Sequence, residues 1–278
     1  MLYKQFKLSE EGSLDGASLT VYIQETQTPK LRIKKRPLVI VCPGGGYAYT
    51  SDREAEPIAL ALMAKGYHAA VLRYSCAPAH YPTALLELGR CVLTIREHAG
   101  EWCVDDNAII VQGSSAGGHL AASFACFWKE DFLSEKLLGN TEGAAKEKLR
   151  PNGLMLCYPV ITSGEYAHKD SFKNLLGDRL AELEKKMSLE NAVNIDVPDS
   201  FIWTTYTDGS VPAENSLLFA MALKKCGINT EFHMFCEGGH GLALANEVTS
   251  GPEGKEVVPS CEVWIDLATC WLKNKFYI

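Results

Sequence analysis

The most regular feature of the chain is a series of short apolar segments, rich in β-branched residues, separated by longer stretches of mixed polarity. Apolar runs of this length are typical of strands that are buried in a sheet. The segments that predict strands are residues 2–8, 19–25, 37–42, 68–74, 107–112, 153–158, 201–206 and 230–235.

The stretches between these segments carry helical patterns and helix-ending signals. Ser51 is followed three residues later by Glu54, which predicts a capping box at the start of a helix. This helix is expected to run to about Lys65 and to end at Gly66. Further helices are predicted over about 83–100, 118–125, 213–225 and 258–274.

Strands and helices alternate from residue 37 to the end of the chain. This order predicts an α/β fold, with a mostly parallel eight-stranded sheet and helices on both faces. The first two strands are expected to form an antiparallel edge. The length of 278 residues fits a single domain, residues 1–278.

Three stretches interrupt the alternation without adding a strand. Residues 26–36 are polar and basic and predict a surface connection, and the highly charged residues 129–150 predict a surface excursion. Residues 161–198 have mixed polar and helical patterns and no strong core strand. We expect this last stretch to form a small cap inserted between two strands.

Charge and composition exclude several classes of partner. The formal net charge of −7 argues against nucleic acid and against an anionic membrane surface, and no apolar run is long enough to span a bilayer. Residues 1–7 lack the apolar core of a signal peptide. The ten cysteines are spread singly, without a Cys-x-x-Cys pair. They predict reduced core residues, Cys91, Cys126, Cys157, Cys226 and Cys270 among them, in a cytoplasmic protein. Neither a metal nor another cofactor is expected, because ligand spacing is absent.

The stretch Gly113-Ser114-Ser115-Ala116-Gly117 has the form G-x-S-x-G and lies between a predicted strand and a predicted helix. This context predicts a sharp turn that needs glycines, because neighbouring chains crowd it and the backbone of Ser115 is strained. The hydroxyl of Ser115 would then project beyond the strand, where the helix N-terminus favours developing negative charge. The alternative is a helix start rich in glycine and serine that has no chemistry.

Two further strand ends carry groups that could assist this serine. In open α/β sheets, functional residues gather at the carboxyl ends of strands. His240 would supply the base that a serine hydroxyl needs, and Asp208 would orient the imidazole and stabilise its charged form. The order Ser, Asp, His along the chain is the order of the α/β hydrolases. Asp199 and Glu237 are weaker candidates for the acid, since neither immediately follows a strand end.

A fourth strand end carries the glycines 43–46 with Pro43 in front. The oxygen of a tetrahedral intermediate needs fixed N–H donors, and Gly45, Gly46 and Ala116 are the candidates. A phosphate-binding loop is the alternative, but no Gly-Lys-Ser/Thr follows the glycines.

The remaining aromatic and histidine side chains near these strand ends divide into two groups. Tyr47, directly after the glycines, and His168, in the predicted cap, are expected to contact substrate. His119 lies one helical turn after Ser115 and His233 alternates within a strand, so both are expected to pack in the interior.

Taken together, these motifs resemble those of the α/β-hydrolase serine esterases, and within them the acetylxylan-esterase-like and acetyl-esterase branch. The resemblance covers nearly the whole chain and implies that Ser115 is the nucleophile, Asp208 the acid and His240 the base. Many relatives begin the glycine motif with histidine where this chain has Pro43, a change that puts a loop-steadying hydrogen bond at risk. The matching stretches are PGGGY at 43–47, SDREAEPIA at 51–59, GSSAGGHLAAS at 113–123, YPVI at 158–161, TDGSVPAENSLLFAMAL at 207–223 and GGHGL at 238–242.

The resemblance implies a carboxylic-ester hydrolase that removes short acyl groups, above all acetyl, from small or sugar-derived substrates. A serine triad suits an ester on a sugar better than a glycosidic bond, which usually needs a pair of carboxylates. A peptidase or amidase with the same triad is one alternative. A ligand-binding protein without catalysis is another, and loss of a triad residue would indicate it.

Overall fold

The structure, a computed structural model, describes residues 1–25 and 33–276, and within these residues eight strands form one sheet. Most of the predicted surface connection 26–36 therefore lies outside the described residues. The strands are β1 Leu2–Lys7, β2 Ser18–Ile23, β3 Arg36–Cys42, β4 His68–Arg73, β5 Val104–Ser114, β6 Gly153–Cys157, β7 Ser200–Thr205 and β8 Thr230–Phe235.

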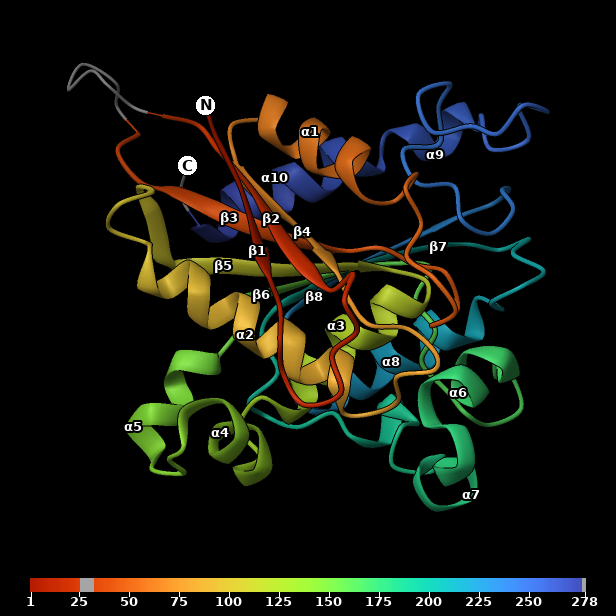
Figure 1. Cartoon of the computed structure of the whole chain (residues 1–278). Coiled ribbons are helices and arrows are strands. Elements are labelled where there is room, and N and C mark those ends of the chain that lie inside the picture. The colour runs from red at the N-terminus through yellow and green to blue at the C-terminus, as the bar shows by residue number, and fades with distance from the viewer. Residues whose placement is uncertain (26–32, 277–278) are drawn as a thin grey trace.

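The strand order across the sheet is β1-β2-β4-β3-β5-β6-β7-β8 (Figure 1). From β4 to β8 neighbouring strands are parallel, whereas β2 pairs antiparallel with both β1 and β4. The strands β3, β6 and β7 are buried almost throughout, because helices cover both faces of a parallel sheet. The predicted mostly parallel sheet with an antiparallel N-terminal edge is confirmed.

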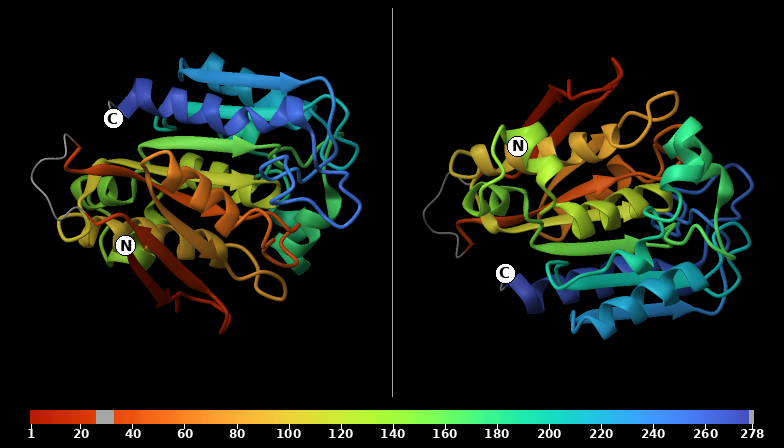
Figure 2. Two further views of the ribbon diagram at one scale, coloured as in Figure 1. Left: turned by 90° about the horizontal axis from the view of Figure 1, so that it is seen from above. Right: turned by 90° about the horizontal axis from the view of Figure 1, so that it is seen from below.

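Helices cover both faces of the sheet, as predicted (Figures 1 and 2). Buried side chains of α1 and α10 belong to one apolar cluster, and those of α2, α3 and α8 belong to the other. The helices are α1 Glu56–Ala64, α2 Thr83–Glu97, α3 Ala116–Phe127, α4 Asp131–Leu138, α5 Gly143–Lys146, α6 Lys169–Leu176, α7 Leu180–Leu183, α8 Glu214–Lys225, α9 Pro259–Glu262 and α10 Trp264–Phe276. Short 3₁₀ turns cover η1 Glu147–Leu149, η2 Gly177–Arg179 and η3 Leu189–Asn191.

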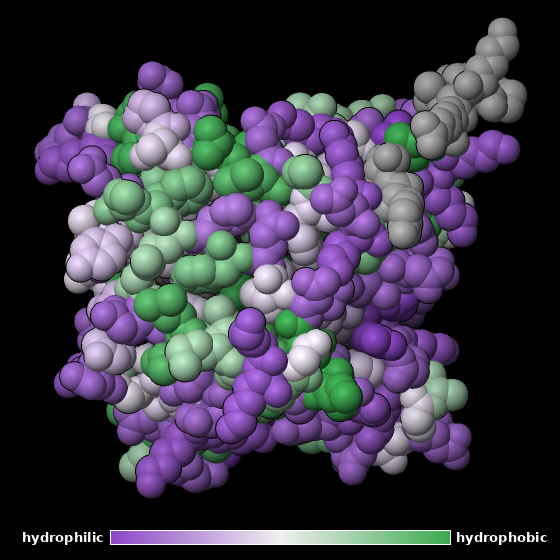
Figure 3. All heavy atoms as spheres, turned by 180° about the vertical axis from the view of Figure 1, so that it is seen from behind, coloured by the Kyte–Doolittle hydropathy of each residue, from purple (hydrophilic) through white to green (hydrophobic). Residues whose placement is uncertain are grey.

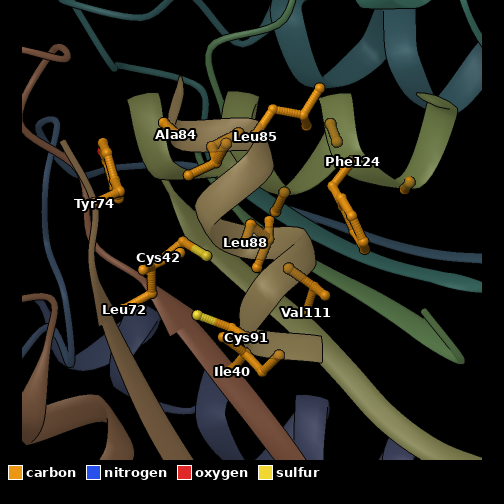
Figure 4. Close-up of a cluster of buried hydrophobic side chains, with 14 of the residues drawn as sticks. Ile40, Cys42, Leu72, Tyr74, Ala84, Leu85, Leu88, Cys91, Val111 and Phe124 are labelled. Carbon is orange, nitrogen blue, oxygen red and sulfur yellow. The ribbon is translucent and has the colours of Figure 1, made fainter. Parts of the chain in front are cut away.

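The core between α2 and the sheet shows how the apolar pattern is used. Leu88 and Cys91 of α2 point toward Ile40 and Cys42 of β3 and Val111 of β5 (Figure 4). All ten cysteines are free thiols. Six are buried, but the expectation of a core position is wrong for the other four: Cys103 and Cys226 are only partly buried, and Cys236 and Cys270 are exposed.

β8 forms the far edge of the sheet. Figure 3 views this side of the molecule, where apolar patches are interspersed with hydrophilic side chains. On β8 and the neighbouring helix α8, the exposed apolar residues include Leu217 and Met221 of α8 and Met234 of β8.

Several predicted boundaries change in the structure. The capping box is wrong: α1 begins at Glu56 after Ala55, no side chain caps it, and the carboxylate of Glu54 points into the interior. The predicted final helix is divided into α9 and α10. The charged excursion 129–150 contains α4, α5 and η1.

The predicted cap, 161–198, lies between β6 and β7. It consists of α6, α7, η2 and η3, and Figure 1 shows α6 and α7 beside one end of the sheet. Its position at that end places it next to the loops that follow the parallel strands.

Candidate active site

The turn at Ser115 has the geometry that the sequence predicts. β5 ends at Ser114 and α3 begins at Ala116, so Ser115 alone connects strand to helix, with φ 53° and ψ −120°. A positive φ is rare for a residue with a side chain and is a form of backbone strain. The N–H of Ser115 donates to the carbonyl of Cys157 at 3.0 Å, which fixes the turn against β6.

Glycine is required around the turn because backbone atoms lie too close for a side chain. A Cβ atom on Gly113 would lie 2.1 Å from the carbonyl oxygen of Gly117, and one on Gly117 would lie 2.1 Å from that of Cys42. The start of α3 thus packs directly against the end of β3. The hydroxyl of Ser115 is left at the carboxyl end of the sheet.

Ser115, His240 and Asp208 are joined by two short hydrogen bonds. Ser115 Oγ lies 2.7 Å from Nε2 of His240, and Nδ1 of His240 lies 2.7 Å from Oδ2 of Asp208. Asp208 lies in the loop after β7 and His240 in the loop after β8. The structure thus brings the three residues together across more than a hundred positions of sequence.

The partners of Asp208 indicate which ring nitrogen of His240 carries the proton. The Asp208 side chain is fully buried, and its Oδ1 accepts the N–H groups of Ser210 and Val211, both at 2.9 Å. A carboxylate held in this way accepts a hydrogen bond from the protonated Nδ1 of His240. Nε2 is then free to accept the Ser115 hydroxyl proton, the orientation that nucleophilic catalysis needs.

The glycine loop after β3 lies against the serine. A Cβ atom on Gly44 would come within 2.8 Å of the Ser115 Cβ atom, and the pocket wall includes Gly45 and Gly46. In residues 1–25 and 33–276, the N–H groups of Gly45, Gly46 and Ala116 donate to no protein acceptor. These three predicted donors are therefore available to a ligand at Ser115.

Side chains steady this loop although it lacks a leading histidine. The Tyr74 hydroxyl donates to the Pro43 carbonyl at 2.7 Å, and Asn174 of α6 donates to the Gly46 carbonyl at 2.9 Å. The Gly44 N–H donates to the carboxylate of Glu54 at 3.0 Å. The loop that begins at Pro43 is thus held by Tyr74, directly after β4, by Asn174 of α6 and by Glu54.

A cavity of about 530 Å³ opens above Ser115 and His240. Sequence reasoning missed most of its polar wall, since these residues lie in loops or in the short cap helix α6, where no periodic signal marks them. The residues that it missed are Tyr49, Ser51, Arg53, Glu54, Asp170, Asn174 and Ser210. The S-x-x-E pattern at Ser51 and Glu54 was the one signal available, and it predicts a helix cap instead.

The two side chains expected to contact substrate have different positions. His168 lines the cavity from the cap, and its Nδ1 lies 2.8 Å from Ser171 Oγ. Burial, with His240 nearby, lowers the pKa of His168 below its ordinary value, so its neutral form is favoured. The expectation for Tyr47 is wrong: Tyr47 is only 2% exposed, is absent from the cavity wall, and bonds to His119 Nδ1 through its hydroxyl.

The other histidines lie away from the cavity. His119 is buried, its Nε2 bonds to the Met187 carbonyl, and burial lowers the pKa of its ring to about 4. This confirms the predicted core position. The expectation of an interior position is wrong for His233: it is partly exposed on β8, tilted against Phe201, with its Nε2 2.9 Å from Oε1 of Glu231.

The described residues, 1–25 and 33–276, contain neither a candidate metal site nor a candidate membrane span. No cluster of three or more His, Cys, Asp or Glu side chains could hold a metal ion there. No helix in that part of the chain is long and apolar enough to cross a membrane.

Comparison with known proteins places this site in a family. The family model BD-FAE matches residues 24–223. The chain belongs to the BD-FAE family. It is 37% identical over 229 residues to endo-1,4-beta-xylanase B of Butyrivibrio fibrisolvens, and 25% identical over 213 residues to an acetylxylan esterase of Xylanibacter ruminicola. These matches cover 80% and 74% of this chain, but only 35% and 41% of those longer proteins.

Solved structures similar to this BD-FAE member match over almost their whole length. An acetyl ester-xyloside bifunctional hydrolase from Caldicellulosiruptor lactoaceticus shares 37% identity with a TM-score of 0.79, covering 94% of this chain and 89% of that one. A carboxylesterase from Lactobacillus plantarum shares 31% identity with a TM-score of 0.82, covering 99% and 98%. The predicted α/β-hydrolase fold is confirmed. The chain is a homologue of esterases in the branch that includes acetylxylan esterase.

Proposed function

We propose that this protein is a serine carboxylic-ester hydrolase in which Ser115, His240 and Asp208 act as nucleophile, base and acid. The observation that carries the proposal is the unbroken hydrogen-bond chain Ser115 Oγ–His240–Asp208 at the floor of an open cavity. A ligand-binding protein without catalysis would not need a buried carboxylate aligned behind the histidine.

The single-domain organisation, 1–278, stays a prediction.

The geometry supports two half-reactions. Nε2 of His240 takes the hydroxyl proton while Ser115 Oγ attacks the acyl carbon, and the N–H groups of Gly45, Gly46 and Ala116 hold the resulting oxyanion. His240 then gives its proton to the departing alcohol, which leaves an acyl group on Ser115. In the second half-reaction a water molecule loses its proton to His240 and attacks the acyl carbon. The carboxylic acid departs, and Ser115 regains its proton.

We propose short acyl groups, acetyl above all, on small or sugar-derived alcohols as the substrates. The cap, 161–198, is short, so it can cover a small pocket but cannot form a deep tunnel for a lipid chain. The cavity wall offers Asp170 and Asn174 as partners for hydroxyl groups, and Tyr49 at its rim is 63% exposed, with a flat face for a sugar ring. The names of the acetylxylan esterase and acetyl ester-xyloside hydrolase relatives agree with this choice.

The decisive experiment is Ser115→Ala, assayed with an ester panel of increasing acyl length that includes acetylated sugars. Loss of the nucleophile should lower kcat by about 10⁴-fold or more while the fold is retained. Ser114→Ala is the matched control, because Ser114 Oγ is buried and bonds to Gln112 instead of His240. Turnover by pure Ser115→Ala protein would refute the triad.

The same panel tests the finer parts of the proposal. Faster turnover of long-chain than of acetyl esters would refute the short-acyl preference, and faster cleavage of matched amides would favour a peptidase or amidase. We expect a chelator to leave the rate unchanged, since the triad needs no Lewis acid. Activity that a chelator removes and zinc restores would contradict that expectation.

A further inference from the structure

Behind the proposed triad lies a buried chain of hydrogen bonds that links two of its loops. Glu54 is only 4% exposed, and each of its carboxylate oxygens has a donor. Oε2 accepts the N–H of Gly44 at 3.0 Å, and Oε1 accepts the hydroxyl of Tyr158 at 2.7 Å. The Tyr158 oxygen in turn accepts the N–H of Ala243 at 2.9 Å.

The two ends of this chain of hydrogen bonds lie in the two loops that carry the proposed oxyanion donors and the proposed base. Gly44 directly precedes the proposed oxyanion donors Gly45 and Gly46, and Ala243 lies three residues after His240. The ring of Tyr158 also packs edge-on against the ring of His240, with centroids 5.2 Å apart. Glu54 thus touches the donor side of the site directly and the base side through one tyrosine.

The preceding residue strengthens the same link. The Arg53 guanidinium donates to the carbonyl oxygens of Gly241, at 3.0 Å, and of Thr249. Both acceptors lie in the loop that carries His240. Residues 53 and 54 therefore bind the base loop and the glycine loop from one short segment between β3 and α1.

We propose that Glu54 is a positioning residue for ester hydrolysis, whose buried carboxylate sets the glycine loop in register with the loop of His240. The inference rests on the proposed function, because the register matters only if Ser115 chemistry takes place between the two loops. A buried carboxylate is costly unless donors satisfy it, and a helix cap would have kept Glu54 in solvent. A buried position for the Glu54 carboxylate is explained if the geometry of the transition state depends on its hydrogen bonds.

The physical expectation is a loss in kcat rather than in substrate binding. The N–H groups of Gly45 and Gly46 would donate to an oxyanion that develops only as the transition state is reached. A shifted loop would therefore weaken the stabilisation of the transition state more than the binding of the ester. A displacement of about 1 Å from a mutation away from the reacting atoms can cost about 10²-fold in rate.

The test compares Glu54→Ala, Glu54→Gln and Tyr158→Phe with p-nitrophenyl acetate as substrate. Active sites are counted by covalent labelling with a fluorophosphonate, so unfolded molecules do not enter the rate. We expect Glu54→Ala to lower kcat per labelled site by about 10²-fold with a much smaller change in KM. Glu54→Gln should lose less, because it keeps one acceptor oxygen in the same shape. Tyr158→Phe should also lose less, because the bond from Gly44 remains.

The double variant Glu54→Gln, Tyr158→Phe tests the coupling. If both residues act through one network, the combined loss in kcat is smaller than the product of the two single losses. A full product would overturn the proposed link between the loops.

Glu87→Gln is the matched control. Glu87 is another buried carboxylate, its donors come from Ser13 and Ser75, and none of its partners belongs to the site. Its replacement should leave kcat per labelled site unchanged. The positioning role of Glu54 would be overturned if both Glu54 variants kept the wild-type kcat, or if only their KM changed. The esterase proposal would still stand in that case, provided that Ser115→Ala is inactive. Turnover by Ser115→Ala would refute the esterase proposal itself.

Discussion

At the scale of single residues, two aspartates near β7 show how position decides chemistry. Asp208 follows the carboxyl end of β7, is fully buried as a side chain, and contacts His240. Asp199 precedes the amino end of the same strand and forms an ion pair with Lys275 at 2.6 Å. The two ends of one parallel strand thus place the same residue type either beside the cavity, at the carboxyl end, or far from it, at the amino end.

We expect Asp208→Asn to lower kcat by up to about 10⁴-fold, because an amide can stabilise the wrong tautomer of His240 and cannot balance the charge of the imidazolium. Asp199→Asn is the control and should change kcat little, since it removes a partly exposed ion pair. The measurement is kcat with an acetyl ester for both variants. The reverse ranking would assign the acid role to Asp199.

At the scale of elements, the site depends on the close contact of α3 with the ends of β3 and β5. A Cβ atom on Gly117 would lie 2.1 Å from the Cys42 carbonyl oxygen and 2.4 Å from that of Pro43. Both neighbours are backbone atoms at the start of the glycine loop, so they cannot turn aside as a flexible side chain would. The helix and the loop therefore share one contact surface, and a shift of either moves the proposed oxyanion donors.

Gly117→Ala should consequently lower the free energy of unfolding by about 1–3 kcal/mol or more, as overpacking of a tight contact does. The surviving folded protein should also lose activity, because the turn at Ser115 is displaced. Gly143→Ala is the matched control: an added Cβ atom at the start of α5 would meet nothing within 4 Å. It should be neutral or stabilising by up to about 1 kcal/mol. The measurement is the free energy of unfolding of both variants in urea. Equal values for Gly117→Ala and Gly143→Ala would contradict the packing argument.

At the scale of the whole molecule, a buried carboxylate joins the N-terminal segment to the far end of β4. Glu87 of α2 accepts hydrogen bonds from Ser13 and from both the N–H and the hydroxyl of Ser75. Burial raises the pKa of its carboxyl above the ordinary value of 4.5, and these hydrogen bonds reduce the shift. Folding therefore favours the protonated form of Glu87.

The sign of the resulting pH dependence follows from linkage. The stability that a raised pKa contributes is fully present below about pH 4.5, the unfolded value, and is lost as pH rises through the folded value. Glu87→Gln keeps the shape and never ionises. The free energy of unfolding of the wild type, relative to Glu87→Gln, should thus decrease as pH rises from about 4 toward neutrality. Urea titrations of both proteins across that range test this; a constant or rising difference would contradict it.

The sequence by itself determined the strands, their approximate ends and the residues that follow them. Apolar runs and G-x-S-x-G are local patterns, and a parallel sheet brings the carboxyl ends of its strands to one edge whatever the loops between them do. Ser115, Asp208 and His240 could be expected to meet for this reason. The glycine loop could be expected beside them in the same way.

The tertiary structure alone decided where Glu54 and Tyr47 point. The pattern from Ser51 to Glu54 is a local helix signal, but Gly44 and Tyr158 offer that carboxylate buried donors instead. Tyr158 is 104 residues away and follows β6, whereas Glu54 follows β3. The two meet because both β3 and β6 pair with β5, so that the carboxyl ends of the three strands lie together. Tyr47 likewise turns inward to His119 of α3. Such contacts depend on which strands are neighbours, and hydrophobic periodicity along one chain carries no information about that order.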